Sequence, residues 1–162
     1  MDNTPLLVIM GVSGTGKSTI GKLLAEKYKV PFYDGDDFHP EENIAKMASG
    51  IPLNDYDRRG WLMRLNELLH SNSEKGAVVA CSALKETYRS QLAQGPGNIQ
   101  FVFLDGSFDQ VKSRLKQRQG HFMPLDLLKS QFDTLERPKN AIKVNIMNTP
   151  DKIVQEIINK LG

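Results

Sequence analysis

The sequence has little cysteine, no long apolar run and no large excess of charge, and each shortage excludes a class of protein. Its 162 residues contain one cysteine, Cys81, so an internal disulfide cannot form and a cysteine-based zinc site is not expected. No stretch is long and apolar enough to span a bilayer. The net charge of +2, from 21 Lys and Arg against 19 Asp and Glu, does not indicate a nucleic-acid or membrane-surface partner.

The remaining composition is that of an ordinary globular protein. Hydrophobic residues make up 40% of the chain and charged residues 25%. The length suits one domain with a sizeable core, so we expect residues 1–162 to form a single domain. Residues 1–5 contain no basic region or apolar core of the kind that opens a signal peptide, and we therefore expect a cytoplasmic protein.

Five short apolar runs alternate with longer stretches of helical periodicity. The runs are residues 6–10, 31–34, 77–81, 99–104 and 143–147. Several are almost continuously hydrophobic, as strands buried on both faces are. The last helical stretch has a clear start, with Thr149 as N-cap and Pro150 in the first turn. This alternation predicts an α/β fold in which a parallel five-stranded sheet carries helices on both faces.

Two segments, at about 35–60 and 118–140, are too polar to belong to the core. Excursions of this length in a compact domain are typical of functional lids rather than of spacers. Trp61, just after the first segment, begins an apolar stripe at helical spacing and is expected in the core.

Residues 11–18 read Gly-Val-Ser-Gly-Thr-Gly-Lys-Ser, between a predicted strand and a predicted helix. The glycines allow backbone conformations that a Cβ forbids, so the N–H groups of the loop can surround a phosphate at the positive end of the helix dipole. Lys17 supplies a cation for the β- and γ-phosphates, and the Ser18 hydroxyl can ligate Mg²⁺. The motif predicts a nucleotide held by Gly11, Ser13, Gly14, Thr15, Gly16, Lys17, Ser18 and Thr19.

Asp34 and Asp36 follow the second predicted strand. If the extended form persists, the two carboxylates share a side at the carboxyl end of a strand, where open α/β sheets bind ligands. Asp34 could then orient Mg²⁺ through its water, and Asp36 could accept the proton of an attacking hydroxyl. In isolation the pair would better fit a solvated acidic turn, because such turns are common. Beside a phosphate-binding loop, it indicates the acceptor site of a kinase.

Arg114 and Arg118 lie four residues apart on one face of a predicted helix at 108–119, and Gly120 and Pro124 break the pattern after it. Paired arginines beside such a segment fit a cover over ATP, where they can stabilise the transferring phosphoryl group or stack on adenine. Taken alone, they would better fit a basic helix face that only contacts water, as most such arginine pairs do. The phosphate-binding loop favours the cover, so we add Arg114 and Arg118 to the nucleotide-binding residues.

Longer motifs along nearly the whole chain resemble the gluconate kinase (gluconokinase) family, a group of small P-loop kinases related to shikimate kinase and the nucleoside monophosphate kinases. The matching segments are 10–18, 34–40, 43–55, 57–58, 61–62, 81–85, 88–89, 114–118, 120–123, 131–132 and 135–136. The run from His39 to Asp55, with Cys-Ser-Ala-Leu-Lys and Gly-His-Phe, is far more specific than the P-loop. The family usually has an acidic residue at Tyr56 and a proline at Gly60, which bears on fine substrate preference.

The resemblance implies the P-loop kinase fold and transfer of phosphate from ATP, with Mg²⁺, to the 6-hydroxyl of D-gluconate. The products are 6-phospho-D-gluconate and ADP, in carbohydrate acid catabolism linked to the pentose phosphate pathway. Lys17, Asp36 and Arg118 are the implied catalytic residues, and Ser18 and Asp34 the metal ligands. Candidates for binding gluconate are Asp36, His39, Arg58, Lys85, Arg89 and His121. Lys85 and Arg89, four residues apart after the third strand, are expected to bring their charges together beside the P-loop. The resemblance also implies a homodimer.

Three other functions stay open from the sequence. One is a kinase of the same fold that acts on shikimate, a nucleoside monophosphate or another sugar acid. Another is a nucleotide-binding regulatory module without phosphotransfer, which would not need the acceptor-site carboxylate Asp36. The third is a nucleic-acid end kinase, against which the near-neutral charge weighs. We therefore expect a small-molecule substrate and neither a nucleic-acid nor a membrane partner.

Overall fold

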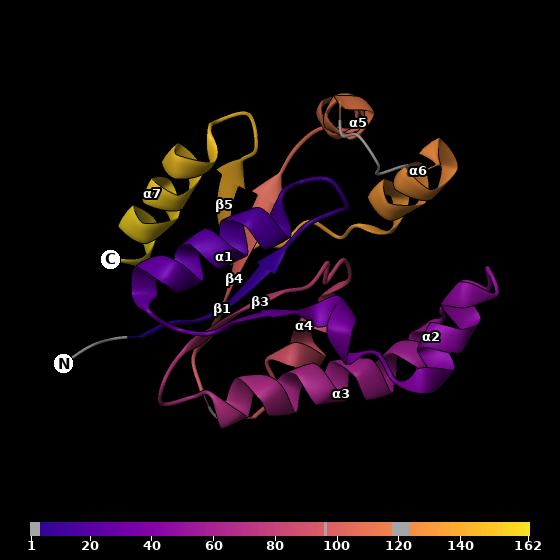
Figure 1. Cartoon of the computed structure of the whole chain (residues 1–162), viewed down its shortest axis with the longest axis horizontal. Helices are drawn as coiled ribbons and strands as arrows, with labels where there is room; N and C mark the ends of the chain where they lie inside the picture. The colour runs from indigo at the N-terminus through magenta and orange to yellow at the C-terminus, as the bar shows by residue number, and fades with distance from the viewer. Residues whose placement is uncertain (1–3, 96, 118–123) are drawn as a thin grey trace.

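A computed structural model describes residues 4–95, 97–117 and 124–162 (Figure 1). Its five strands are β1 (Leu6–Met10), β2 (Phe32–Asp34), β3 (Ala77–Ala80), β4 (Ile99–Asp105) and β5 (Ile142–Asn145). They form one sheet in the order β2-β3-β1-β4-β5, and every neighbouring pair is parallel. The predicted parallel five-stranded sheet is confirmed, and each of the five apolar runs overlaps one strand.

Helices fill the connections between the strands and follow the last strand. They are α1 (Lys17–Tyr28), α2 (Glu41–Ala48), α3 (Asp55–Ser71), α4 (Glu86–Leu92), α5 (Phe108–Gln117), α6 (Leu125–Thr134) and α7 (Pro150–Leu161), with a 3₁₀ turn, η1 (Gly35–Phe38). The start of α7 is as predicted, since the Thr149 side chain accepts a hydrogen bond from the N–H of Lys152. None of the helices within the described ranges is long and apolar enough to cross a membrane.

The sheet is buried on both faces, which explains why its strands are apolar throughout. Successive side chains of β1 point to opposite faces. Leu7 and Ile9 pack in the core cluster that contains the buried residues of α1 and α7, whereas Val8 packs with Leu65 and the other buried residues of α3 and α4. Figure 1 shows these two helix layers on either side of the sheet. Trp61 is only 5% exposed, so its predicted place in the core is confirmed.

The three strands β2, β3 and β1 bring three loops to one edge of the sheet. The P-loop follows β1, the 3₁₀ turn follows β2, and Cys81 and Ser82 follow β3. The N–H of Gly11 donates to the carbonyl of Ser82 (3.2 Å), which ties the P-loop to the end of β3. Because all these strands are parallel, their carboxyl ends meet at this edge, where ligands bind in open α/β sheets.

The polar segment 35–60 folds as the 3₁₀ turn, α2 and the first residues of α3 rather than as an irregular loop. A capping box begins α3: the Asn54 side chain accepts from the N–H of Asp57 (2.8 Å), and the Asp57 carboxylate accepts from the N–H of Asn54 (3.0 Å). The same carboxylate pairs with Lys46 of α2 at 2.8 Å. Asp57 therefore both starts α3 and holds α2 against it.

Candidate active site

The P-loop has the backbone that its sequence predicts. Gly14 and Gly16 have φ angles of +83° and +93°, in a region that L side chains rarely adopt, and α1 begins at Lys17 directly after them. Thr15 is 1% exposed, and its hydroxyl donates to the carbonyl of Val12 (2.9 Å), which closes the turn from inside. The N-terminus of α1 is thereby presented to the space above the loop.

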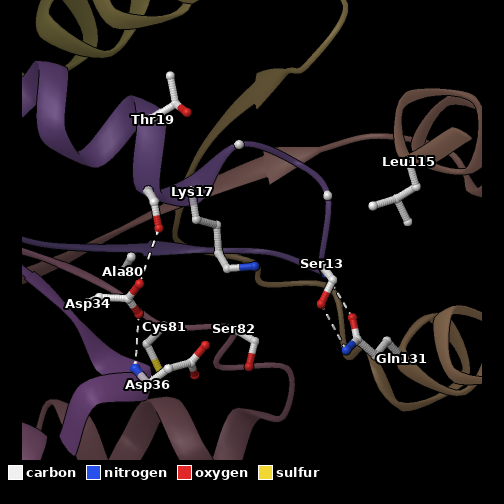
Figure 2. Close-up of a pocket in the computed structure, with 13 residues that line it drawn as sticks. Ser13, Lys17, Thr19, Asp34, Asp36, Ala80, Cys81, Ser82, Leu115 and Gln131 are labelled. Atoms are coloured by element: carbon white, nitrogen blue, oxygen red, sulfur yellow. Dashed lines mark hydrogen bonds between the residues drawn. The ribbon is translucent and has the colours of Figure 1, made fainter. Parts of the chain in front are cut away.

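A cavity of about 470 Å³ opens in front of this loop (Figure 2), within the usual size range of a small-molecule site. Its walls are Ser13, Gly14, Gly16, Lys17, Ser18, Thr19, Asp34, Asp36, Ala80, Cys81, Ser82, Leu115 and Gln131. Six predicted nucleotide-binding residues thus line the cavity, whereas Gly11 and Thr15 belong to the loop but do not line the cavity. The Lys17 ammonium donates to the carbonyls of Gly11 and Val12, both at 3.0 Å. Burial raises the pKa of Cys81 to about 12, so its side chain is a neutral thiol.

Asp34 connects the P-loop helix to the turn that carries Asp36. One carboxylate oxygen accepts from the Ser18 hydroxyl (3.4 Å), and the other accepts from the backbone N–H of Asp36 (3.0 Å). The second bond makes Asp34 the N-cap of the 3₁₀ turn, so the extended form that the sequence suggested for residues 34–36 is wrong. Both carboxylates nevertheless line the same cavity, because the turn folds Asp36 back toward the P-loop (Figure 2).

Ser18 and Asp34 offer a hydroxyl and a carboxylate oxygen side by side. Mg²⁺ in nucleotide sites is held by one or two such protein oxygens together with phosphates and water, so these two residues fit it. No group of three or more His, Cys, Asp or Glu side chains suited to a metal is found in the part of the chain that the structure describes. This donor set therefore fits a cation that arrives with a phosphate ligand.

Asp36 has a pKa above its usual value. Partial desolvation of its carboxyl group is the largest cause, the negative charges of Asp34 and Asp37 add to it, and His39 and Lys17 oppose it. Asp36 keeps solvent-accessible surface at the open mouth of the cavity. A carboxylate of raised proton affinity beside a phosphate-binding loop is suited to accept a proton from a bound hydroxyl.

Two aromatic residues support the turn from below. The Trp61 indole N–H donates to the carbonyl of Gly35 (2.7 Å), and its ring stacks on His39 with centroids 4.2 Å apart. His39 is 8% exposed, and its Nδ1 lies 3.3 Å from the amide nitrogen of Asn43. Burial is the main cause that lowers the pKa of His39, with Arg58 adding to it and Asp36 opposing it. His39 is therefore a buried neighbour of Asp36 and is not among the residues that line the cavity.

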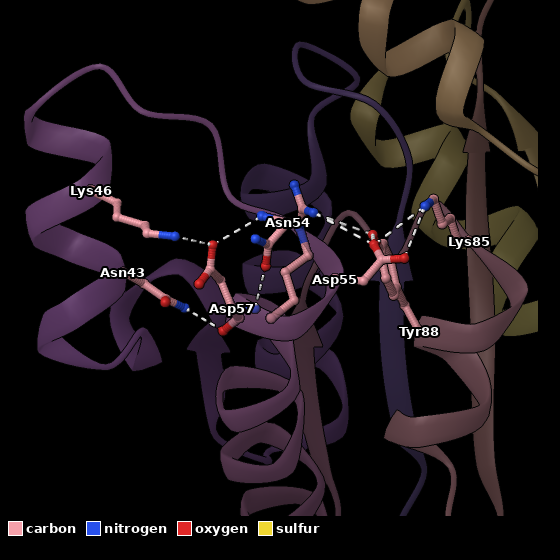
Figure 3. A network of polar contacts seen from close by, with 8 residues as sticks. Asn43, Lys46, Asn54, Asp55, Asp57, Lys85 and Tyr88 are labelled. Atoms are coloured by element: carbon pink, nitrogen blue, oxygen red, sulfur yellow. Dashed lines mark hydrogen bonds and ion pairs between the residues drawn. The ribbon is translucent and has the colours of Figure 1, made fainter.

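Arg58 and Lys85 both pair with the carboxylate of Asp55, the first residue of α3. Figure 3 shows Lys85 beside this carboxylate. Lys85 Nζ lies 3.3 Å from both carboxylate oxygens, and Arg58 Nη1 lies 3.9 Å from one of them. The Tyr88 hydroxyl donates to the same oxygen at 2.5 Å. Hydrogen bonds from Tyr88 and Lys85 are the largest causes that lower the pKa of Asp55. Two of the predicted gluconate-binding residues thus converge, at a carboxylate that the sequence did not single out.

Arg89 does not join them, and the predicted convergence of Lys85 and Arg89 is wrong. Arg89 is 4% exposed and donates to the carbonyls of Ala83 (2.7 Å) and Glu136 (2.8 Å). Lys85 is the N-cap of α4 with extended backbone angles, so the helical spacing that puts residues four apart on one face does not apply to the pair. Arg89 instead fastens α4 to the segment after α6.

The predicted cover is only partly within the described residues. Arg118 and His121 lie outside them. Arg114 lies beside the P-loop, since its Nη2 is 3.6 Å from the position that a Cβ on Gly16 would occupy. Its guanidinium also donates to the carbonyl of Ile146 (3.1 Å). Helix α6, within the polar segment 118–140, contacts the loop through Gln131.

Gln131 is a site residue to which the sequence assigned no role. Its amide oxygen accepts from the N–H of Ser13 (2.8 Å), and its amide nitrogen donates to the Ser13 hydroxyl (3.1 Å). The two residues are 118 positions apart, so no local pattern could have paired them. Asp55 and Tyr88 were missed for the same reason, since they meet only when α3 packs on α4.

Comparison with known proteins identifies the family. The shikimate kinase family matches residues 13–161. A probable gluconokinase of Mus musculus is 44% identical, with 99% of this chain and 100% of its own length aligned. The thermosensitive gluconokinase of Escherichia coli (strain K12) is 49% identical, with 82% of this chain and 72% of its own length aligned. The chain belongs to the gluconokinase family. The resemblance inferred from the motifs is confirmed.

Solved structures agree with this assignment. A gluconokinase from Sinorhizobium meliloti 1021 superposes with a TM-score of 0.89 at 44% identity, covering 99% of this chain and 93% of that one. A shikimate kinase from Aquifex aeolicus, at 22% identity and a TM-score of 0.59, covers 96% of this chain and 94% of that one. The second likeness shows the shared fold alone, and the predicted P-loop kinase fold is confirmed.

Gly35→Ala should damage both stability and activity, because the structure leaves no room for a side chain between Asp34 and Asp36. A Cβ at this position would lie 2.6 Å from the carbonyl oxygen of Ala80. We expect a loss of about 1–3 kcal/mol in the free energy of unfolding, measured in urea, and at least a roughly tenfold lower kcat as Asp36 shifts.

Gly60→Ala is the matched control. Gly60 lies inside α3, and the nearest atom to an added Cβ is Pro40 Cγ at 3.8 Å, so the substitution should raise stability by about 0.5–1 kcal/mol and leave the turn in place. Equal stability and equal kcat of the Gly35→Ala variant and the wild type would contradict the account of this turn.

Proposed function

We propose that this protein is a gluconokinase, which transfers the γ-phosphoryl group of ATP to the 6-hydroxyl of D-gluconate and yields 6-phospho-D-gluconate and ADP. The observation that carries the proposal is the joint presence of Lys17 and Asp36 in one cavity, where Asp34 accepts hydrogen bonds from the Ser18 hydroxyl and from the backbone N–H of Asp36. The relatives named gluconokinase, aligned over most of the chain, support the choice of acceptor.

The donor half of the site is the P-loop. Its N–H groups and the N-terminus of α1 would hold the phosphates of ATP, and Lys17 would turn from the carbonyls of Gly11 and Val12 toward them. Ser18 and Asp34 would hold Mg²⁺, which when bound neutralises part of the phosphate charge. Arg114, and Arg118 from the undescribed stretch, would spread positive charge over the transferring group.

The acceptor half centres on Asp36. The 6-hydroxyl oxygen of gluconate forms a bond to the γ-phosphorus while the bond from that phosphorus to the bridging oxygen of ATP breaks. The hydroxyl proton passes to the Asp36 carboxylate, and ADP leaves with the bridging oxygen. The raised pKa of Asp36 favours this transfer because it increases the proton affinity of the base.

The carboxylate of gluconate would bind Arg58 and Lys85, which converge at Asp55. His39 and His121 stay predicted gluconate-binding residues. Arg89 is not part of this proposal, because its guanidinium binds carbonyls of the chain itself. A homodimer and a cytoplasmic location complete the proposal.

A screen of acceptors tests the substrate. With ATP and Mg²⁺, release of ADP should be at least about 100-fold faster, as kcat/KM, with D-gluconate than with shikimate, a nucleoside monophosphate or D-glucuronate. ³¹P NMR of the product should give a phosphomonoester at C6. Faster release of ADP with another acceptor would show that this acceptor, and not gluconate, is the substrate. Binding of ATP without turnover on any acceptor would favour a regulatory module.

Asp36→Asn tests the base. The amide keeps the size of the side chain but cannot take the proton, so kcat should fall by about 100-fold or more while the KM for ATP stays within about threefold. Asp37→Asn is the control, because Asp37 is the adjacent exposed carboxylate and does not line the cavity. A kcat within twofold of wild type for Asp36→Asn would remove the assignment of Asp36 as base.

A further inference from the structure

An exposed carboxylate lies between the two cations that the proposed function assigns to the substrate. The Asp55 side chain is 63% exposed, yet it contacts Lys85, Arg58 and the hydroxyl of Tyr88. Figure 3 shows Lys85, the N-cap of α4, and Tyr88, within α4, pointing toward Asp55 at the start of α3. Three donors from two helices thus surround one carboxylate that remains open to solvent.

The capping box that begins α3 does not include Asp55. The capping box is made by Asn54 and Asp57, and the pair between Asp57 and Lys46 ties α2 to α3. The carboxylate of Asp55 contacts neither the capping groups nor α2 among the contacts described. Its interactions are confined to the cluster of Arg58, Lys85 and Tyr88.

The cluster is tied to the cavity by chain position and packing. Lys85 comes three residues after Ser82, which lines the cavity. Arg58 precedes Trp61 by three residues on α3, and Trp61 donates to the carbonyl of Gly35 and stacks on His39 beside Asp36. A six-carbon acid whose terminal hydroxyl approaches Asp36 would extend from the cavity toward Arg58 and Lys85. Its carboxylate would then reach the same three donors that Asp55 uses.

We propose that the Asp55 carboxylate is an internal stand-in for the carboxylate of the acceptor, which must displace it from Lys85, Arg58 and Tyr88 in order to bind. This rests on the proposed function. Asp55 keeps the two cations paired before substrate arrives, and it makes entry an exchange of one carboxylate for another. A neutral polyol cannot make this exchange, so Asp55 weakens the binding of the acid while it keeps the donors in place for it.

Asp55→Asn tests the proposal. The amide has nearly the same size and still accepts the Tyr88 hydrogen bond, but it carries no charge to compete. The KM for gluconate should fall by about fivefold, which is the size of effect expected when an exposed carboxylate with several partners no longer competes. The kcat and the KM for ATP should stay within about twofold of wild type. Asp55→Ser, also uncharged and well suited to a helix start, should give the same direction.

Two controls separate competition from a general loss of negative charge. Glu86→Gln removes an exposed carboxylate next to Lys85 that pairs with Arg89 instead, and it should change the KM for gluconate by less than about twofold. D-Glucitol, the uncharged analogue of gluconate, should be phosphorylated with the same kcat/KM by the wild type and by Asp55→Asn, within about twofold.

The outcomes distinguish this proposal from the function on which it rests. If the wild type phosphorylates gluconate and both Asp55 variants have an unchanged or raised KM for gluconate, the proposed role of Asp55 is overturned and the gluconokinase proposal stays intact. An equal gain with D-glucitol, or an equal gain from Glu86→Gln, would also overturn it. No turnover of gluconate by the wild type would overturn both proposals, and calorimetric titration of gluconate without ATP provides the corresponding binding constants.

Discussion

The site depends on one side chain, Asp34, that belongs to both of its halves. Its carboxylate contacts Ser18 at the start of the P-loop helix and caps the turn that carries Asp36. The sheet order β2-β3-β1 makes this possible, because it sets the ends of β2 and β1 on either side of β3. Any movement of Asp34 therefore changes the phosphate-binding side and the proposed proton acceptor together.

Most of the fold could be predicted because it follows from periodicity and from turn chemistry. The five strands appeared as apolar runs, and Thr149 with Pro150 marked the start of α7. The error at residues 34–36 has a local cause. An aspartate can extend a strand or cap a turn with the same side chain, and strand periodicity does not distinguish the two. Here the N–H of Asp36 donates to the Asp34 carboxylate, and this hydrogen bond stabilises the turn.

The site was predictable where function resides in contiguous motifs and was not where it depends on packing. The P-loop and the pair of Asp34 and Asp36 could be inferred from spacing and strand position. The contact of Gln131 with Ser13, and the cluster at Asp55, join segments far apart in the chain, so only the packed helices reveal them. In the packed structure the Arg89 guanidinium donates to a backbone carbonyl. The spacing of four residues between Lys85 and Arg89 did not indicate this contact.

Asp34→Asn measures the central claim most directly. The amide keeps an oxygen that accepts from the N–H of Asp36, so the turn should stay folded. It loses the negative charge beside Ser18, so the binding of Mg²⁺ with ATP should weaken. In steady-state kinetics with ATP and gluconate, we expect kcat to fall on the order of 100-fold and the half-saturating Mg²⁺ concentration to rise roughly tenfold, with an unchanged circular dichroism spectrum. A kcat and a Mg²⁺ dependence both within twofold of wild type would contradict the account.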